Sequence, residues 1–302
     1  MFAAYLSFAY YWFLDFAFLR GVASSYNSKA MLEITDRVKY IIAIASGKGG
    51  VGKSTTAVNL ALALAEKKGV RVGILDADIY GPNQPQMLGV SEKPTSKDGK
   101  TLEPVYAHGL QSMSIGYLID VNTPMIWRGP MATGALQQLL NDTHWDNLDY
   151  LIVDLPPGTG DIQLTLTQKI PLAGAVIVTT PQDIALLDVR KAIGMFNKVK
   201  VPLLGVVENM CMHVCRQCGH EEPIFGDGGG ERIAKECNIN LLGVLPLDSR
   251  IRKQADSGRP IFIAEPHGAI ADVYREIANK IAEQLSQPKT ACRFPKIVIE
   301  KK

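Results

Sequence analysis

The chain has 302 residues, of which 47% are hydrophobic and 21% are charged, an ordinary composition for a globular protein with a sizeable core. The 32 Lys and Arg nearly balance the 30 Asp and Glu, so the net charge of +2 argues against nucleic acid or an anionic membrane as a bulk partner. Five Cys are too few, and odd in number, for a disulfide framework, which favours reduced thiols and a cytoplasmic location.

Residues 1–37 differ in composition from the rest of the chain. Residues 1–19 are apolar and aromatic with Asp15 as their one charge, and residues 21–37 read as a polar linker. The apolar stretch has three interpretations: a membrane anchor, a helix packed on the protein or on a partner, or translation from an upstream start that the working protein does not use. We favour the last two, because the chemistry predicted below needs no anchor, and we expect no membrane partner.

The segment from 38 to 287 alternates between predicted strands and helices. Apolar, β-branched runs predict strands over 38–46, 70–76, 150–154, 174–179, 201–207 and 241–245. Helical spacing predicts helices over 54–68, 130–144, 161–169, 183–199, 229–237, 248–257 and 266–286. This alternation predicts an α/β fold, a mostly parallel sheet with helices on both faces, followed by a weakly ordered tail over 288–302.

A glycine-rich run joins the first strand to the first helix. It reads Gly47-Lys48-Gly49-Gly50-Val51-Gly52-Lys53-Ser54, followed by Thr55, and matches the P-loop pattern in the strand–loop–helix context that the motif requires. Backbone N–H groups and the helix N-terminus would bind the phosphates of ATP. Lys53 is expected to reach the β- and γ-phosphates, and the Ser54 hydroxyl to join the Mg²⁺ shell.

Lys48 is an addition that a general P-loop does not need. The run from Lys48 to Thr55 resembles the deviant Walker A motif of the P-loop ATPases that include MinD and ParA. That resemblance implies a homodimer in which Lys48 reaches the partner's nucleotide and offsets charge on the transferring phosphoryl group.

Carboxylates end two of the predicted strands. Asp76 and Asp78 close the strand over 70–76, and Asp154 closes the strand over 150–154. Beside a P-loop they predict a Mg²⁺ site, with Asp154 holding the ion through a water. The same resemblance implies that Asp78 orients the attacking water, that Asp76 supports the Mg²⁺ site from its strand end, and that residues 156–161 form a switch. Asp161 alternatively caps its helix.

Asn209 follows the strand over 201–207. By resemblance to the same ATPases it recognises the adenine edge of the nucleotide. An Asn at this position is equally a common turn former.

Cys215 and Cys218 form a C-x-x-C pair inside the loop over 211–220. Such a pair presents two thiolates to one metal. Zinc would take four protein ligands, which one chain could complete only with Cys211, His213 or His220. Two chains together supply four thiolates, enough for a bridging [4Fe–4S] cluster. The residues themselves leave zinc and iron both open.

The motifs SGKGGVGKST, ILDADIYGP, IWRGPM, DLPPGTGD, VENM, CxxCGH and IFGDGGGE occur in this order over 38–287. Together they resemble the ApbC/Mrp iron–sulfur cluster carriers. The resemblance implies a slow ATPase whose homodimer binds a [4Fe–4S] cluster through Cys215 and Cys218, with an upstream cluster scaffold and apo iron–sulfur proteins as partners. A MinD/ParA-like positioning ATPase and a zinc-stabilised nucleotide switch are the alternatives, and the helix over 266–286 lacks the basic face of the former.

Overall fold

The computed structural model describes residues 34–119, 127 and 129–287. One eight-stranded sheet forms the centre of this part, with the strand order β10-β7-β6-β1-β5-β2-β4-β3. All neighbouring strands in it are parallel except β3, which is antiparallel to β4. The predicted α/β fold with a mostly parallel sheet is therefore confirmed.

The strands of the large sheet are short and largely buried. They are β1 (Val38–Ala45), β2 (Val72–Asp76), β3 (Val105–Ala107), β4 (Leu110–Ser114), β5 (Leu148–Asp154), β6 (Gly174–Thr179), β7 (Leu203–Glu208) and β10 (Leu241–Val244). The helices are α3 (Lys53–Ala65), α4 (Gln84–Leu88), α5 (Gly129–Asn141), α6 (Asp161–Lys169), α7 (Asp183–Lys198), α8 (Gly229–Cys237), α9 (Ser249–Asp256), α10 (Ile261–Ala264) and α11 (Ala269–Ser286), with a 3₁₀ turn at Ile115–Tyr117.

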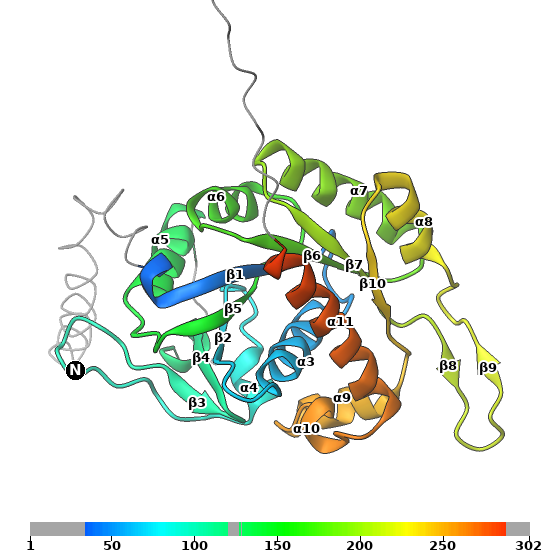
Figure 1. Ribbon diagram of the computed structural model, residues 1–302, viewed down its shortest axis with the longest axis horizontal. Helices are drawn as coiled ribbons and strands as arrows, with labels where there is room; N and C mark the ends of the chain where they lie inside the picture. The colour runs from blue at the N-terminus through cyan, green and yellow to red at the C-terminus, as the bar shows by residue number, and fades with distance from the viewer. Residues whose placement is uncertain (1–33, 120–126, 128, 288–302) are drawn as a thin grey trace, which may run out of the picture.

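Helices cover both faces of the sheet (Figure 1). On one face α5, α6, α7 and α8 lie against it, and their inward side chains include Leu136, Val189 and Phe196. On the other face lie α3, α10 and α11, with Leu60 and Tyr274 among the buried residues. The central strands read as continuous apolar runs because both of their faces are buried.

The strands β3 and β4 were not predicted. The sequence of β4, Leu110–Ser114, is half polar, yet every residue in it is buried. Its polar side chains find partners outside the strand: Gln111 accepts from the Asp146 amide, Ser112 pairs with the nearby Tyr117 hydroxyl, and Ser114 donates to Asp76. Because the partners of Gln111 and Ser114 lie far away in the chain, local periodicity could not identify the strand.

The folded unit begins before the predicted boundary at Val38. Residues 34–37 are helical, Ile34 is buried, and the Arg37 guanidinium donates to the carbonyl oxygens of Asn141 and Thr143. The apolar segment over 1–19 and the tail over 288–302 lie outside the described residues. Within the described ranges, no helix combines the length and apolar character that crossing a membrane requires.

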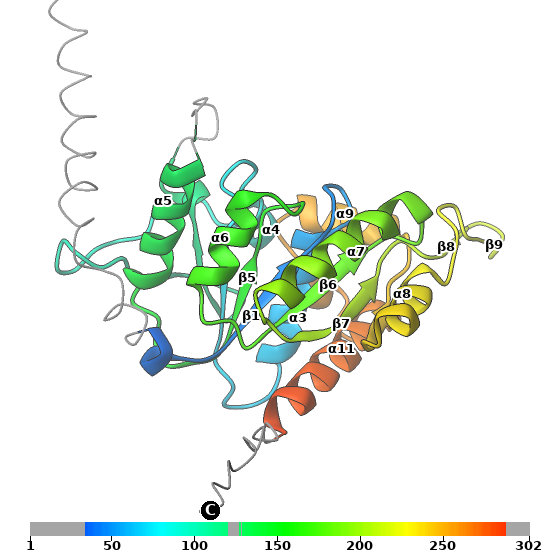
Figure 2. The same cartoon turned by 90° about the horizontal axis from the view of Figure 1, so that it is seen from above.

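A small antiparallel hairpin leaves the body of the domain after β7. Its strands β8 (His213–Val214) and β9 (Glu221–Glu222) pair only with each other. Figures 1 and 2 show it projecting beyond the sheet and helices at the β10 end of the molecule. The C-x-x-C pair lies in the turn of this hairpin.

Candidate nucleotide and thiolate sites

The P-loop connects β1 to α3 at the C-terminal edge of the sheet, where parallel α/β sheets bind ligands. Gly50 and Gly52 have φ of 80° and 85°, which a side chain would strain, so the loop can curl only with glycine there. A Cβ at Gly49 or Gly50 would meet no atom within 4 Å, so this part of the loop faces open space. The loop therefore has both the curvature and the access that phosphate binding needs.

Lys53 lies almost fully buried at the start of α3. Its Nζ donates to Asp154 Oδ1 at 2.5 Å and to Ser54 Oγ at 3.3 Å. The side chains of Lys53 and Asp154 are 7% and 1% exposed, so this is a buried ion pair. The predicted phosphate-binding lysine and the predicted Mg²⁺-site carboxylate are thus in direct contact.

Asp76 and Asp154 are register partners on the adjacent strands β2 and β5. Asp76 is buried and accepts hydrogen bonds from the Asp78 amide at Oδ1, and from the Gln84 amide and the Ser114 hydroxyl at Oδ2. Burial, and then the charge of Asp154, raise the pKa of Asp76 to about 7. Both oxygens of Asp76 are thus engaged, and its role in supporting the site stays a prediction.

Asp78 lies two residues past the end of β2 and is only partly buried. Burial is the main cause that raises its pKa, and the nearby Lys53 charge opposes this. Ser54 and Thr55 are half-buried on the first turn of α3, and Lys48 is half-buried on the loop. The Gly158 amide, from the segment predicted to be a switch, donates to the Ser46 carbonyl directly before the P-loop.

These residues fit a magnesium–nucleotide complex. In such sites the phosphates and waters provide most of the Mg²⁺ ligands, and the protein adds one or two oxygens. Ser54 and Asp154 both contact the Lys53 ammonium and supply oxygens of the kind that would hold Mg²⁺. The ion would neutralise charge on the phosphates.

Asn209 packs against the P-loop from the end of β7. Its Nδ2 donates to the Val51 carbonyl at 2.9 Å, and its Oδ1 accepts from the Met210 amide. A Cβ at Gly52 would collide with the same Asn209 amide. The Nδ2 contact thus joins the loop after β7 to the P-loop, and the Oδ1 contact stays within the loop after β7. Recognition of adenine by Asn209 stays a prediction.

The two predicted cluster ligands lie in the hairpin turn. The Cys215 amide donates to the His220 carbonyl, and the Gly219 amide donates back to the Cys215 carbonyl, which closes a compact knuckle. Hydrogen bonds from the backbones of Cys218 and Gln217, and from the Cys218 side chain, lower the pKa of the Cys215 thiol. Cys218 is exposed. The turn therefore presents two neighbouring sulfur atoms and favours the thiolate form of one.

The other described cysteines differ from this pair. Burial raises the pKa of both Cys211 and Cys237, so their thiols ionise less readily. Across residues 34–119, 127 and 129–287, no three His, Cys, Asp or Glu side chains gather as a group able to hold a metal ion. In the described chain, then, Cys211, His213 and His220 do not complete a zinc site with the pair.

The hairpin is fastened at its base to the loop between β10 and α9. The Cys211 amide donates to the Leu245 carbonyl, and the Leu247 amide donates to the Met212 carbonyl. Beside the knuckle, Arg216 forms an ion pair with Asp248 at 3.1 Å. These contacts make the segment from Asn209 to Arg216 a continuous connection between the P-loop and the two thiols.

Asp248 is also the N-cap of α9, since it accepts from the Arg250 amide. Its ion pair with Arg250 lowers its pKa to about 2. A pocket of about 380 Å³ lies at this junction, lined by Val214, Arg216, Asp248 and Arg250. No local sequence pattern reveals this link, because Arg216 and Asp248 are 32 residues apart in the chain.

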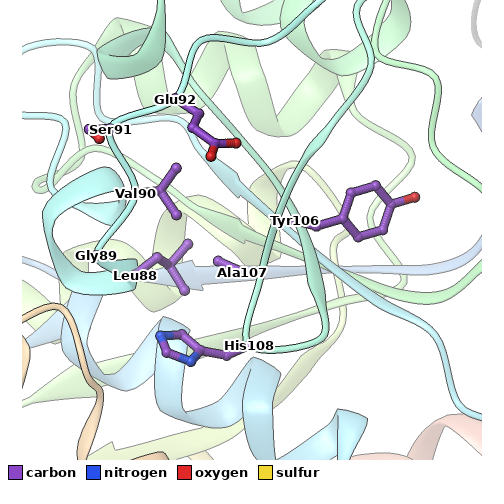
Figure 3. A pocket seen from close by; sticks show the side chains of 8 residues that line it. All are labelled: Leu88, Gly89, Val90, Ser91, Glu92, Tyr106, Ala107 and His108. Carbon is purple, nitrogen blue, oxygen red and sulfur yellow. The ribbon is translucent and has the colours of Figure 1, made fainter.

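A second pocket, of about 280 Å³, lies between the loop after α4 and the β3–β4 turn (Figure 3). Glu92, Tyr106 and His108 are among the side chains around it, and the His108 ring contacts the Gly258 carbonyl. None of the predicted nucleotide or thiolate residues lines this pocket. It is separate from both candidate sites.

Comparison with known proteins identifies the family of this chain. A family model described as "ParA: NUBPL iron-transfer P-loop NTPase" matches residues 37–282. A Pseudomonas fragi protein named "Iron-sulfur cluster carrier protein" is 58% identical over 259 residues, or 85% of this chain and 90% of that protein. A mouse protein named "Iron-sulfur cluster transfer protein NUBPL" is 46% identical over 249 residues, 82% of this chain and 78% of its own length.

Solved structures with a similar fold include nucleotide-binding proteins. A nucleotide-binding protein from Archaeoglobus fulgidus, solved in complex with ADP, is 39% identical with a TM-score of 0.69, over 80% of this chain and 93% of that one. The cell division ATPase MinD of Pyrococcus furiosus shares the fold with a TM-score of 0.61 at 22% identity, over 81% and 99% of the two chains. The chain therefore belongs to the NUBPL iron-transfer family of P-loop NTPases, the ApbC/Mrp group that its motifs resemble.

Proposed function

We propose that this protein is an ATP-hydrolysing carrier that binds a [4Fe–4S] cluster between two copies of the chain and hands it to apo iron–sulfur proteins. The cluster is the cargo, and Cys215 and Cys218 of each copy are its ligands. The observation that carries this proposal is the hairpin turn, which projects beyond the body of the domain (Figures 1 and 2) and contains Cys215 and the exposed Cys218. The names of the relatives support the same cargo.

Two copies are needed because a [4Fe–4S] cluster takes four thiolates. One described chain gathers only two thiols at the turn, and no third metal-binding side chain joins them. A homodimer supplies the missing pair. A reducing compartment such as the cytoplasm suits these thiols, which must stay free of disulfides.

Exposed apolar side chains around the P-loop support the dimer. Ile184 and Leu187, on the first turns of α7, are exposed, as are Tyr80 after β2 and Met131 on the first turn of α5. These segments all follow the C-terminal ends of parallel strands, the same edge of the sheet as the P-loop. A partner that covers this edge would bury them and bring its Lys48 toward the nucleotide.

The ATP half of the function follows from the P-loop. In the structure Lys53 pairs with Asp154, so binding ATP requires Lys53 to exchange that carboxylate for the phosphates. The exchange releases Asp154 Oδ1 for the Mg²⁺ hydration shell. Asp78 would then orient a water that attacks the γ-phosphorus while the bond to the ADP oxygen breaks, and the proton lost by the water would pass to the released phosphate.

The segment after β7 couples the two halves. Asn209 holds the Val51 carbonyl of the P-loop, and six residues later Cys215 begins the knuckle. A movement of Val51 on ATP binding that keeps the Asn209 contact would move this segment as well. That movement would give the nucleotide state a physical route to the cluster ligands.

The test is metal analysis of protein purified and reconstituted without oxygen. We expect about two irons and two sulfides per chain, with a visible absorption band, in the wild type. Cys215→Ala/Cys218→Ala should lose both iron and sulfide but keep ATP binding. Cys237→Ala is the matched control, because it removes a partly buried thiol on α8 and should keep the full load.

Zinc in stoichiometric amount with no iron would overturn the carrier proposal and favour a zinc-stabilised switch. A full iron load in the double variant would overturn the ligand assignment. Iron bound by a protein that stays monomeric would contradict the bridging arrangement.

A further inference from the structure

Gln84 is a buried side chain at the nucleotide site that the P-loop and carboxylate motifs do not include. It is the first residue of α4, and it is 1% exposed. Its backbone N–H donates to Asp76 Oδ2 at 3.1 Å. Its side-chain Nε2 donates to the Ser54 carbonyl at 3.1 Å and to Asp154 Oδ2 at 2.9 Å. One residue thus connects the ends of β2 and β5 with the first turn of α3.

The orientation of the Gln84 amide is determined by its partners. The Ser54 carbonyl and the Asp154 carboxylate are both acceptors, so only the NH₂ end can face them. Its two N–H donors are then both used. The opposite atom, Gln84 Oε1, is buried and has no hydrogen-bond partner in the described structure.

A buried oxygen without a donor costs about 1–3 kcal/mol, so a site that supplies a donor to it is stabilised by comparable amounts. The Lys53 Nζ already donates to Asp154 Oδ1 and to Ser54 Oγ. Waters in a Mg²⁺ shell are donors, and Ser54 and Asp154, both contacted by Gln84, are the residues that fit Mg²⁺.

Gln84 also holds one oxygen of the Asp154 carboxylate. Lys53 holds Oδ1 of the carboxylate and Gln84 holds Oδ2. When Lys53 moves to the phosphates, Oδ1 becomes free, while the Gln84 hydrogen bond still holds the carboxylate in place. Fixing a ligand through a neighbouring hydrogen bond commonly changes metal affinity by 10- to 100-fold, as an order of magnitude.

We propose that Gln84 is a positioning residue of the magnesium–nucleotide site. It orients Asp154 through Nε2 and offers Oε1 to a water of the Mg²⁺ shell. The inference rests on the nucleotide half of the proposed function and is independent of the cluster.

The experiment measures the affinity of a fluorescent ADP analogue in Mg²⁺ and in EDTA, for each variant. Gln84→Leu should lose about tenfold in affinity with Mg²⁺, equal to about 1.4 kcal/mol, and stay within about twofold in EDTA. Gln84→Met, which fills similar volume without branching, should show the same contrast. Gln86→Leu is the matched control, an exposed Gln on the same helix, and should leave both affinities unchanged.

An equal loss in Mg²⁺ and in EDTA for the Gln84 variants would show a general structural role and overturn the inference. Unchanged affinity in Mg²⁺ would overturn it as well. A wild-type protein that binds no ADP analogue under either condition would overturn the nucleotide half of the proposed function, so the two failures are distinguishable.

Discussion

Replacing Lys53 by Met tests the buried ion pair at the centre of the P-loop. Met keeps the length of the side chain and removes its charge. In the wild type, the Lys53 ammonium lies 2.5 Å from Asp154, whose side chain is 1% exposed. In Lys53→Met the carboxylate stays buried with Gln84 Nε2 as its remaining side-chain donor. The variant therefore leaves a buried charge without its counterion.

Removing one partner of a buried ion pair costs about 3–5 kcal/mol, because the other charge stays desolvated. For a domain of this size, each kcal/mol lowers Tm by about 2–4 °C, so we expect a decrease of roughly 6–20 °C. Lys53→Met/Asp154→Asn should recover most of that loss, because the second change removes the unpaired charge while an amide oxygen can still accept from Gln84.

Urea and thermal unfolding, both without nucleotide, measure these differences. Arg190→Met is the matched control: it removes one charge from the Arg190–Glu236 pair, whose side chains are 41% and 48% exposed. Exposed pairs contribute about 0–1 kcal/mol, so this variant should unfold close to the wild type. If Lys53→Met lost no more stability to unfolding than Arg190→Met, the Lys53–Asp154 ion pair would not be present in solution. The exchange of partners proposed for ATP binding would then be wrong.

Two further changes test the surroundings of the sites. Gly52→Ala should abolish binding of the ADP analogue, because the position has φ of 85° and a Cβ there would collide with Asn209. Gly49→Ala has open space around it and should fold like the wild type. Asp248→Asn should keep the α9 cap and lose the charge pairing, at a cost of about 1 kcal/mol or less in urea unfolding at neutral pH. Arg250 holds the folded pKa of Asp248 at about 2, below its unfolded value, so this contribution is complete above about pH 4 and lost as pH falls through 2. If the difference in free energy of unfolding between the wild type and Asp248→Asn increased on acidification, that assignment would be wrong.

Strand–helix alternation predicted the central part of the fold, because strands buried on both faces are apolar along their whole length. Helices α6 and α8 have the bounds that the sequence predicted. The sequence did not predict elements in which buried polar residues bond to residues far away in the chain. The strand β4 is one case, since Gln111 and Ser114 are buried with partners that local pattern does not reveal.

The nucleotide residues could be predicted because a P-loop keeps its chemistry within eight consecutive positions. The facing carboxylates were also foreseen, since parallel strand ends meet at one edge, and Asp76 and Asp154 are indeed opposite each other. Gln84 could not be found in this way. Its role comes from three contacts to Asp76, Ser54 and Asp154, and an isolated Gln before a Pro carries no local signal.

The size of the cysteine hairpin has a thermodynamic consequence. Strands of two residues are too short to be stable by themselves, so β8 and β9 depend on the contacts at their base and on the Arg216–Asp248 pair. Any metal bound by the turn adds crosslinks to a segment that has little stability of its own. Metal binding and ordering of the hairpin turn are then one equilibrium. The affinity for metal therefore includes the free energy of local folding. Hydrogen exchange at the amides of Cys215 and Gly219 would therefore report how much cargo the protein holds.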